Sequence, residues 1–228
     1  NYKIINLRRI AKYVIVDFEN SRSLIVHLGM SGRLKIIKVN IPKKKHDHLV
    51  FKFNNLKLIY NDPRKFGFID VVLSDKIHSI KYIKKLGIDA LDKKLSEEYL
   101  YNKLSKSNVL IKQLLLNQYI VAGIGNIYAC EALWEAKISP YKMCNNMNEQ
   151  NFDDLVDALK IVLTKAINAG GSSLKDFKDT GGELGYFQNL FNVYSRENSY
   201  CKRKYCEGVV IRKKQSGRST FFCSICQL

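Results

Sequence analysis

Four cysteines near the end of the sequence combine a residue type and a spacing that could hold a metal ion. Cys201 and Cys206 read C-x4-C, sixteen residues follow, and Cys223 and Cys226 read C-x2-C. Each short pair can close on a metal from a single turn, and four thiolates are a usual tetrahedral ligand set of structural zinc. The spacing therefore predicts one structural Zn2+ ion bound by these four residues.

The insert between the two cysteine pairs has the pattern of a basic β-hairpin. Residues 207–222 begin with the strand-like run Val209–Ile211, turn at Gly217, and end with the apolar pair Phe221 and Phe222. The cations of this insert are Arg212, Lys213, Lys214 and Arg218. One interpretation is that the metal only staples a tail that is too short to build a core. The other is that the stapled hairpin presents its cations to an anionic partner.

The composition favours nucleic acid as that partner. The 228 residues include 38 Lys and Arg against 21 Asp and Glu, which gives a formal net charge of +17. Such an excess points first to nucleic acid and second to an anionic membrane surface. No run approaches the roughly 18 consecutive apolar residues of a membrane span, so we expect no membrane segment. Thiols that hold zinc suit a reducing cytosol, where Cys130 and Cys144 would be buried or free.

The first third of the chain has the pattern of an antiparallel β-sandwich or barrel. Short apolar runs alternate with turn residues, and helical periodicity is absent. The predicted strands are Tyr13–Phe18, Leu24–Leu28, Leu34–Val39, Leu49–Phe53, Leu56–Tyr60 and Phe68–Leu73.

Three loops in this part of the chain contain residues that a plain β-sandwich does not need for its fold. A basic turn at Leu7–Tyr13 places Lys12 ahead of a strand, and Met30 lies between glycines at a strand end. Arg64 shares a tight loop with Phe66. A cation beside an exposed ring suits the gap that an extruded nucleotide leaves in a duplex. Each loop taken alone could also be a solvated turn.

The middle of the chain has helical patterns. Ser96 is a predicted N-cap, and an apolar helix is expected over residues 109–116, interrupted by the charge of Lys112. Apolar residues recur at i, i+3, i+4 and i+7 from Phe152 to Ile167 and stop at Gly170. We expect these helices to form a packed core.

A glycine-rich turn before a helix could bind phosphate. Gly123, Gly125 and Asn126 precede a predicted helix that runs through Trp134. Free N–H groups at a helix start bind phosphate, and glycine lets the anion approach closely. The G-x-G-N pattern is too short for a dinucleotide fingerprint and does not follow a predicted strand. Further on, residues 170–193 combine glycines with aromatics, which suits either a mobile cover over a pocket or a plain linker.

Taken in order along almost the whole chain, these motifs resemble the bacterial formamidopyrimidine-DNA glycosylase family, whose members remove oxidised purines from DNA. The matching motifs are R-R-x-A-K at Arg8–Lys12, H-L-G-M-S-G at His27–Gly32, K-H-D-H at Lys45–His48, N-D-P-R-K-F-G at Asn61–Gly67, V-A-G-I-G-N-I-Y-A at Val121–Ala129, G-G-x-S-L-x-D-F at Gly170–Phe177, G-Y-F at Gly185–Phe187, V-Y-x-R at Val193–Arg196 and R-x-T at Arg218–Thr220.

The resemblance implies a multidomain α+β fold. Residues 1–73 would be the remainder of a truncated N-terminal β-sandwich, and residues 74–94 a connector. Residues 95–192 would form a helix–two-turns–helix DNA-binding domain with a lesion-covering loop at about 170–187. Residues 193–228 would be a four-cysteine zinc-finger β-hairpin. The expected partner is double-stranded DNA that contains oxidised purines or abasic sites, bound by a monomer in the bacterial cytoplasm, at the nucleoid.

The resemblance also implies roles for single residues. It gives catalytic positions to Lys12, near the reacting nucleotide, and to Arg218, which would grip phosphate. It gives DNA-binding positions to Met30, His46, Arg64, Phe66, Lys112 and Asn126. Met30, Arg64 and Phe66 would fill the space that the flipped-out base vacates.

The implied reaction requires an amine nucleophile. In the family this amine belongs to an N-terminal proline, followed by a glutamate that acts as an acid. It forms a Schiff base with the sugar, and the strand is then cut by β- and δ-elimination. The sequence does not contain this Pro-Glu start, so we expect a fragment that is inactive by itself. Two further departures are the C-x4-C spacing, where C-x2-C is usual, and Ser195, where a glycine is usual.

Two other interpretations stay open at this point. A non-catalytic protein of the same fold could grip damaged DNA without reacting with it. A ribosomal or transcription zinc ribbon would explain the cysteines and the charge. That second reading gives no use to Asn61–Gly67 and Val121–Ala129.

Overall fold

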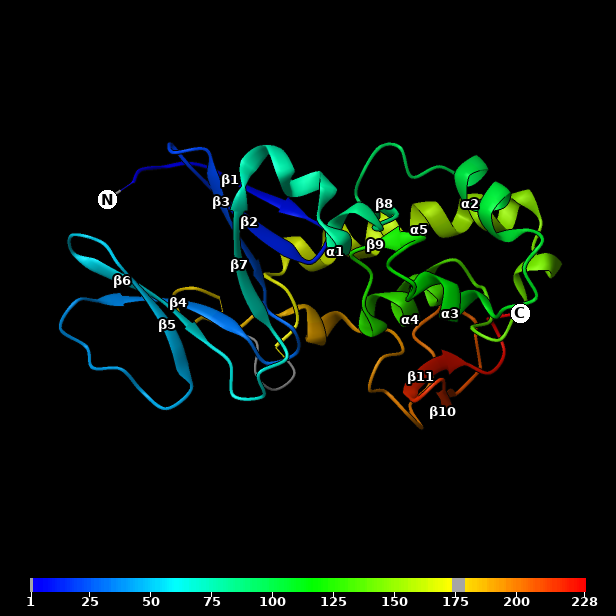
Figure 1. The fold of residues 1–228 in the computed structure, drawn as a ribbon. Helices are drawn as coiled ribbons and strands as arrows, with labels where there is room; N and C mark the ends of the chain where they lie inside the picture. The colour runs from blue at the N-terminus through cyan, green and yellow to red at the C-terminus, as the bar shows by residue number, and fades with distance from the viewer. Residues whose placement is uncertain (1, 174–178) are drawn as a thin grey trace. The chain divides into compact units, whose positions relative to one another are not determined.

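The computed structural model describes residues 2–173 and 179–228, which form two compact units (Figure 1). The sheet unit consists of the chain up to Lys84 together with the described part of 168–188. The helical unit consists of residues 85–167 and 189–228. Residues 168–188 therefore return to the sheet unit after the longest helix. The domain boundaries drawn from the sequence stay a prediction.

The sheet unit is built from two antiparallel sheets. One sheet has the strand order β1-β2-β3-β7, and the other has the order β4-β6-β5. The strands are β1 Ile4–Ile10, β2 Tyr13–Phe18, β3 Arg22–His27, β4 Arg33–Lys38, β5 Asp47–Lys52, β6 Leu56–Asn61 and β7 Phe68–Leu73. Val16, Leu24 and Val26 of the first sheet share a buried cluster with Tyr60 of the second. The predicted β-sandwich is therefore confirmed.

Strand β1 occupies part of the segment where the sequence suggested a basic turn. Arg8 lies within β1 opposite Ile15 of β2. Its Nε donates to Oδ2 of Asp17 at 2.7 Å, and this hydrogen bond lowers the pKa of the Asp17 carboxyl. The Asp17 carboxylate on the neighbouring strand pairs with the guanidinium of Arg8. This pairing allows a charged residue to lie within the strand. The turn itself is confined to Ala11, which has φ of 51°, and Lys12.

The remaining elements lie after β7. They are η1 Ser74–Ser79, α1 Lys81–Lys84, β8 Ile88–Asp89, α2 Glu97–Leu104, α3 Ile111–Leu115, β9 Val121–Ala122, α4 Asn126–Glu135, η2 Cys144–Asn146, α5 Glu149–Asn168, η3 Phe187–Leu190, β10 Val210–Gln215 and β11 Arg218–Cys223. Strands β8 and β9 form a short parallel pair. The G-x-G-N turn thus does follow a strand, although β9 has only two residues, too few for a sequence pattern to reveal.

Helix signals in the sequence agree with the structure. The hydroxyl of Ser96 accepts a hydrogen bond from the Tyr99 amide at 3.1 Å, as expected of an N-cap. Helix α5 buries Phe152, Leu155 and Leu159, which belong to the predicted apolar face. The predicted hairpin is also present, with β10 and β11 in register from Val210–Cys223 to Gln215–Arg218.

A buried carboxylate in α4 holds the segment that leads to the cysteines. Glu131 is 1% exposed, and its two oxygens accept hydrogen bonds from the amides of Asn192, Val193 and Tyr194 at 2.8–2.9 Å. The side chain of Asn192 donates to the same carboxylate at 3.1 Å. Four donors on one anion compensate its desolvation. Glu131 therefore holds residues 192–194, which lead into the cysteine-containing tail, against α4.

Replacing Glu131 with alanine should destabilise the helical unit. The substitution leaves buried N–H groups without an acceptor, and each such group costs about 1–3 kcal/mol. We expect a loss of about 3 kcal/mol in the free energy of unfolding, measured by urea titration with the fluorescence of Trp134, the one tryptophan of the sequence. Glu135→Ala, in the same helix, removes only a partly exposed ion pair with Lys165 and should cost below about 0.5 kcal/mol. Equal losses would contradict the role given to Glu131.

Candidate nucleic-acid and metal sites

The four cysteines of the tail converge on one point. The Sγ atoms of Cys201, Cys206, Cys223 and Cys226 all lie within 4.8 Å of one another. The Sγ atoms of Cys201 and Cys226 are 3.8 Å apart, and those of Cys206 and Cys223 are 3.6 Å apart. These distances exceed the length of a disulfide bond, which is about 2.05 Å. The cluster has the ligand number and type for a metal ion, as the spacing predicted.

Nearby N–H groups make the cluster suitable for thiolates. The Trp134 indole donates to Sγ of Cys201 at 3.3 Å, and the Arg203 amide approaches the same sulfur at 3.5 Å. Burial raises the pKa of the Cys201 thiol, but these donors outweigh it and lower the value to about 7. The amides of Ile225 and Cys226 approach the Cys223 sulfur at 3.4 and 3.5 Å. Donors aimed at sulfur stabilise the anionic form that binds metal. At Cys223 and Cys226 burial outweighs the donors and raises the pKa of both thiols.

The longer C-x4-C turn has a structural use. Arg203, inside this turn, stacks 4.4 Å above the Trp134 ring and donates to the Trp134 carbonyl at 2.5 Å. It thereby adds a side-chain donor to a carbonyl at the end of α4 that also accepts from the Lys137 amide at 3.0 Å. Tyr205 closes the turn with φ of 63°. The two extra residues thus accommodate an attachment to α4 and leave the four sulfurs together.

The hairpin presents its tip through a tight turn. Ser216 and Gly217 have φ of 47° and 77°, which favours glycine at the second position and suits a two-residue hairpin loop. The Gln113 amide of α3 donates to the Ser216 hydroxyl at 2.6 Å. Arg218 begins β11 and is exposed. Helix α3 therefore contacts the turn of the predicted basic hairpin directly.

The start of α4 is open, as a phosphate site requires. Its N-cap is Gly125, which makes no side-chain cap, and a Cβ placed there would meet no atom within 4 Å. The preceding turn is fixed by Gln118, which accepts from the Gly123 amide at 2.9 Å and donates to the Ile124 carbonyl at 2.9 Å. The helix N-terminus, with its positive end of the dipole, is thus held rigidly while remaining accessible.

Lys112, a DNA-binding position by the family resemblance, has a buried side chain. It is 1% exposed, and its Nζ donates to Oδ1 of Asn126 at 2.7 Å and to Oγ1 of Thr220 at 2.8 Å. Burial lowers the pKa of Lys112. Within the described part of the chain, no carboxylate pairs with this ammonium group. The Asn126 amide also donates to the Ser219 carbonyl at 2.9 Å. Lys112 and Asn126 together therefore tie α3, α4 and β11 into one network.

A small pocket opens beside this network. Its volume is about 70 Å³, and its lining includes Lys112, Gln215 and Arg218. Two cations without a bonded carboxylate make the pocket positive, and Arg218 is close enough to depress the pKa of Lys112 further. The pocket, the start of α4 and the hairpin tip all belong to the helical unit.

In the sheet unit, the carboxylate of Asp62 holds together the two loops that carry Met30, Arg64 and Phe66. Asp62 is fully buried, and its carboxylate accepts from the Ser31 hydroxyl at 2.5 Å and from the amide of Gly67 at 2.8 Å. The Arg64 amide donates to the Ser31 hydroxyl at 3.2 Å. Hydrogen bonds to the charged form keep the pKa of Asp62 low despite its burial. These hydrogen bonds therefore hold the Met30 loop and the Arg64 loop together.

The side chains predicted to enter DNA are exposed at these loops. Met30 is 69% exposed and Phe66 is 57% exposed, so both apolar side chains are accessible. The Arg64 guanidinium lies 4.9 Å from the Phe66 ring centre. A Cβ at Gly29 would lie 2.5 Å from the Phe66 carbonyl carbon, so only glycine lets the two loops pack. The structure thus brings Met30, Arg64 and Phe66 to neighbouring loops.

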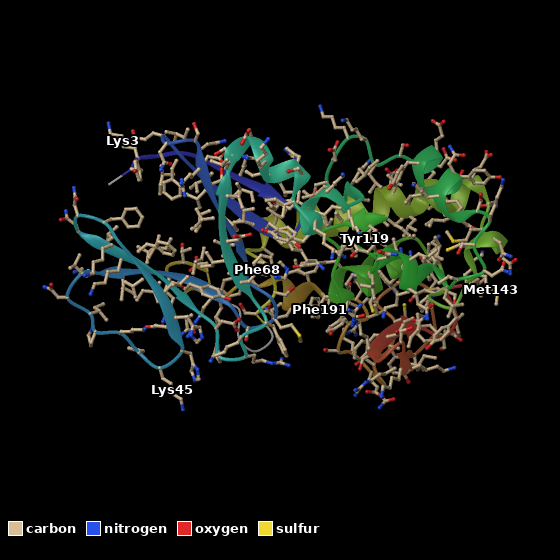
Figure 2. The ribbon with its side chains drawn as sticks, viewed as in Figure 1. Lys3, Lys45, Phe68, Tyr119, Met143 and Phe191 are labelled. Carbon is tan, nitrogen blue, oxygen red and sulfur yellow. The ribbon has the colours of Figure 1, made fainter. Side chains whose placement is uncertain are left out.

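Lys12 has an imidazole neighbour that the sequence argument did not single out. Lys12 is exposed at the β1–β2 turn, and its charge contributes, after burial, to the lowered pKa of His27. The His27 ring lies 5.0 Å from the Tyr13 ring and stacks on Phe68 at 5.5 Å. Phe68, labelled in Figure 2, is the first residue of β7. His27 directly precedes the Met30 loop. Its place immediately before L-G-M-S-G is the feature of the sequence that could have pointed to it.

His46, the other histidine considered from the sequence, is half-buried and has φ of 69°. Its carbonyl accepts a hydrogen bond from the Asp62 amide at 3.1 Å.

The glycine-rich segment after α5 is described only in part. Residues 174–178 of the predicted lesion-covering loop lie outside the described residues. Ser172 pairs with Tyr186 in an isolated β-bridge, and the Tyr186 amide donates to the Ala169 carbonyl at 2.8 Å. Among the described helices, none is long and apolar enough to cross a membrane.

The chain matches known proteins over its whole length. Residues 1–69 match the formamidopyrimidine-DNA glycosylase N-terminal domain, and residues 86–178 match the formamidopyrimidine-DNA glycosylase H2TH domain. Formamidopyrimidine-DNA glycosylases from Rickettsia conorii and Rickettsia bellii are 44% and 46% identical over 228 residues. The match to the Rickettsia conorii protein covers 100% of this chain and 82% of the relative.

Solved structures of similar sequence have the same fold. The Lactococcus lactis Fpg in complex with an abasic-site DNA is 38% identical, with a TM-score of 0.92 over 99% of this chain and 82% of that one. The wild-type protein from the same organism with an oxidised-pyrimidine DNA is 36% identical, with a TM-score of 0.91 over 100% and 82%. These likenesses confirm the predicted sandwich, helical region and cysteine-rich end as one fold.

Gly208→Ala should weaken metal binding. A Cβ at position 208 would lie 2.5 Å from the Cys223 sulfur and 3.3 Å from the Cys206 sulfur, so the ligands must move. We expect metal affinity to fall on the order of 10- to 100-fold, as it does when groups around ligands are altered, measured by chelator competition. Gly125→Ala adds the same methyl group into open space and should leave metal affinity unchanged. Unchanged affinity in Gly208→Ala would mean that the sulfurs are not the ligands in this arrangement.

Proposed function

This chain belongs to the formamidopyrimidine-DNA glycosylase family, and we propose that it removes oxidised purines from duplex DNA and cleaves the strand at the resulting abasic site. As a family member it is a DNA repair glycosylase. The specificity for 8-oxoguanine and formamidopyrimidines, and the lyase step, are the proposal. The observation that carries it is the group of exposed side chains Met30, Arg64 and Phe66 on loops locked by one buried carboxylate.

These three side chains suit the space left by an extruded base. A glycosylase must take its target base out of the stack, and this costs a few kcal/mol of unstacking. Met30 and Phe66 can replace the lost stacking, while Arg64, which lies over the Phe66 ring, can donate hydrogen bonds to the orphaned partner base. Because Asp62 fixes both loops before DNA arrives, little ordering entropy is lost on binding.

The helical unit supplies the phosphate contacts in this proposal. The open N-terminus of α4 offers N–H groups, and Asn126 retains one amide hydrogen after its bond to the Ser219 carbonyl. Arg218 contacts a phosphate from the hairpin tip. Lys112 acts behind them: its buried charge, without a bonded carboxylate, raises the positive potential that a phosphate meets. His46 is proposed as an additional DNA contact of the sheet unit.

The reaction itself needs an amine that attacks the anomeric carbon. We propose that a Pro-Glu start, which these 228 residues do not include, provides it, as the family resemblance implies. The proline nitrogen forms a bond to the anomeric carbon, the bond to the base breaks, and the base leaves with a proton. The resulting Schiff base lets the phosphates depart by β- and δ-elimination. We propose that Lys12, whose charge acts on His27, contacts the phosphate or sugar at the reacting nucleotide.

The cysteine cluster fits a structural Zn2+ ion. Cys201, Cys206, Cys223 and Cys226 are close enough to serve as its ligands, and a four-thiolate site with no open position would serve structure, not catalysis. When bound, the ion supplies folding free energy to the tail that carries Arg218. We also propose that the segment around residues 172–186 covers the extruded base, and that the protein acts as a monomer in the bacterial cytoplasm.

Arg218→Ala should weaken DNA binding without unfolding the tail. Arg218 is exposed at the hairpin tip, so its loss removes a phosphate contact while Cys223 and its partners stay in place. We expect the slope of log K against log salt to fall by about 0.9, the change for one phosphate contact, measured by anisotropy titrations at several salt concentrations. Arg212→Ala, on the same hairpin, removes a cation that pairs with Glu197 at 3.5 Å and should change the slope less. A larger effect of Arg212→Ala would reassign the phosphate contact.

The proposed reaction can be tested by trapping the Schiff base. The chain is extended with a Pro-Glu start and mixed with duplex DNA containing 8-oxoguanine, in the presence of borohydride. We expect a covalent protein–DNA adduct and loss of the modified base, and no adduct with undamaged duplex. If the extended chain binds lesion duplex tightly but forms no adduct, the protein is a damaged-DNA-binding protein without catalysis.

A further inference from the structure

A tryptophan at the end of α4 directs its one side-chain donor at the cysteine cluster. The Trp134 indole N–H donates to Sγ of Cys201 at 3.3 Å, and Trp134 is 7% exposed. Trp134, Cys201 and Cys223 belong to the same buried cluster. Helix α4 lies beside β11 of the hairpin (Figure 1). The last turn of α4 therefore supplies a hydrogen bond to a sulfur of the first cysteine pair.

Arg203 is held over this tryptophan by two contacts of different kinds. Its Cζ lies 4.4 Å from the centre of the Trp134 ring, and its Nη2 donates to the Trp134 carbonyl at 2.5 Å. Its main-chain amide approaches Sγ of Cys201 at 3.5 Å. A planar guanidinium that is held by a ring face and by a carbonyl has little freedom left. The directions of its remaining N–H groups are thus fixed.

One of these N–H groups is buried and has no acceptor among the described residues. Nε of Arg203 is shielded from solvent and makes no hydrogen bond within the part of the chain that the structure describes. Burying a donor without a partner is costly, so such a group in a native fold indicates a partner of some kind. Burial raises the pKa of the Cys226 thiol, and the Arg203 guanidinium counteracts that rise as a donor. The guanidinium therefore lies within reach of this sulfur.

We propose that Trp134 and Arg203 are positioning residues for the metal, each donating to a ligand sulfur without binding the ion. This inference rests on the proposed Zn2+ ion. Trp134 donates to Cys201 of the first cysteine pair, and Arg203 donates to Cys226 of the second. A divalent ion held by four thiolates leaves an anionic centre, which is costly to bury unless donors and a cation surround it. The charge of Arg203 and the two N–H groups compensate this centre and orient its ligands.

The longer first turn brings Arg203 to this place. The Cys206 amide donates to the Arg203 carbonyl at 3.1 Å, and Tyr205 between them has φ of 63°. These features return the chain to the cluster after Arg203. The C-x2-C turn that is usual in the family has two residues fewer between its cysteines. The additional length gives the turn room for a side chain that reaches both α4 and the sulfurs.

The test measures the Zn2+ affinity of the 228-residue chain by chelator competition. Trp134→Phe keeps an aromatic ring under Arg203 and removes the indole N–H, and Arg203→Ala removes the guanidinium. We expect each substitution to lower the affinity on the order of 10- to 100-fold, the usual effect of losing a group that hydrogen-bonds a metal ligand. Arg203→Lys keeps the charge without the planar set of donors and should recover only part of the loss.

Lys204→Ala is the matched control in the same turn. Nζ of Lys204 lies 4.8 Å from the centre of the Tyr205 ring, and Tyr205 is 89% exposed. This substitution removes a cation that faces an exposed ring, so the Zn2+ affinity should stay unchanged.

Co2+ in place of Zn2+ separates donation to sulfur from packing. A hydrogen bond to a thiolate lowers the energy of its electrons, so losing the bond should move the sulfur-to-cobalt charge-transfer band to longer wavelength. We expect this shift in Trp134→Phe and in Arg203→Ala. A purely structural role for these side chains would weaken binding and leave the band in place.

Three outcomes would overturn the proposal: unchanged Zn2+ affinity in Trp134→Phe or Arg203→Ala, an equal loss in Lys204→Ala, or weakened binding with an unmoved band. If the unsubstituted chain bound neither Zn2+ nor Co2+, the proposed metal site itself would fail. The two failures are therefore distinguishable, because the first requires a chain that binds the ion.

Discussion

Helix α4 is the constraint on which the helical unit depends. Its ten residues are attached at three levels: Asn126 to β11, Glu131 to the segment 192–194, and Trp134 to the cysteine cluster. Each attachment is a hydrogen bond shielded wholly or partly from water, where it is stronger and more directional than at the surface. The N-terminus of α4 therefore has a position set from the opposite end, through the cysteine cluster. Under the proposed function, a metal ion held by this cluster influences a phosphate contact without touching DNA.

Buried charges of opposite sign are treated differently in this protein. Asp62 and Glu131 are surrounded by amide and hydroxyl donors that compensate their desolvation. Among the described residues, Lys112 has neutral acceptors alone, the side-chain amide oxygen of Asn126 and the hydroxyl of Thr220. A buried cation that lacks an anion is costly until an external one approaches. The two anions therefore stabilise loops, while the cation favours an incoming phosphate.

The sequence predicted those features that depend on residues close together in the chain. The cysteine spacing gave the metal ligands, alternation gave six strands, and the N-cap at Ser96 was confirmed. The burial of Lys112 could not be predicted, because a lysine is ordinarily at the surface and its acceptors lie 14 and 108 residues away. Strand β1 was hidden for a similar reason, since the partner of Arg8 is on the next strand. The hydrogen bond from the Ile36 amide to the Thr180 carbonyl involves backbone atoms alone, which leave no mark in a sequence.

Cations and uncharged side chains have different parts in the proposed binding of DNA. Residues 193–228 contain eight Lys and Arg against two acidic residues, and none of the four buried carboxylates Asp17, Asp47, Asp62 and Glu131 lies in that stretch. Those carboxylates are engaged with internal donors, so they do little to offset surface cations. Residues 1–84 and 168–188 contain 20 Lys and Arg against 9 acidic residues, and residues 85–167 and 189–228 contain 18 against 12, so both units attract a polyanion, and this attraction depends on salt. The side chains offered to the gap in the stack, Met30 and Phe66, are uncharged and act by filling space. Salt should therefore tune how tightly the protein binds DNA, and hardly alter which nucleotide it selects.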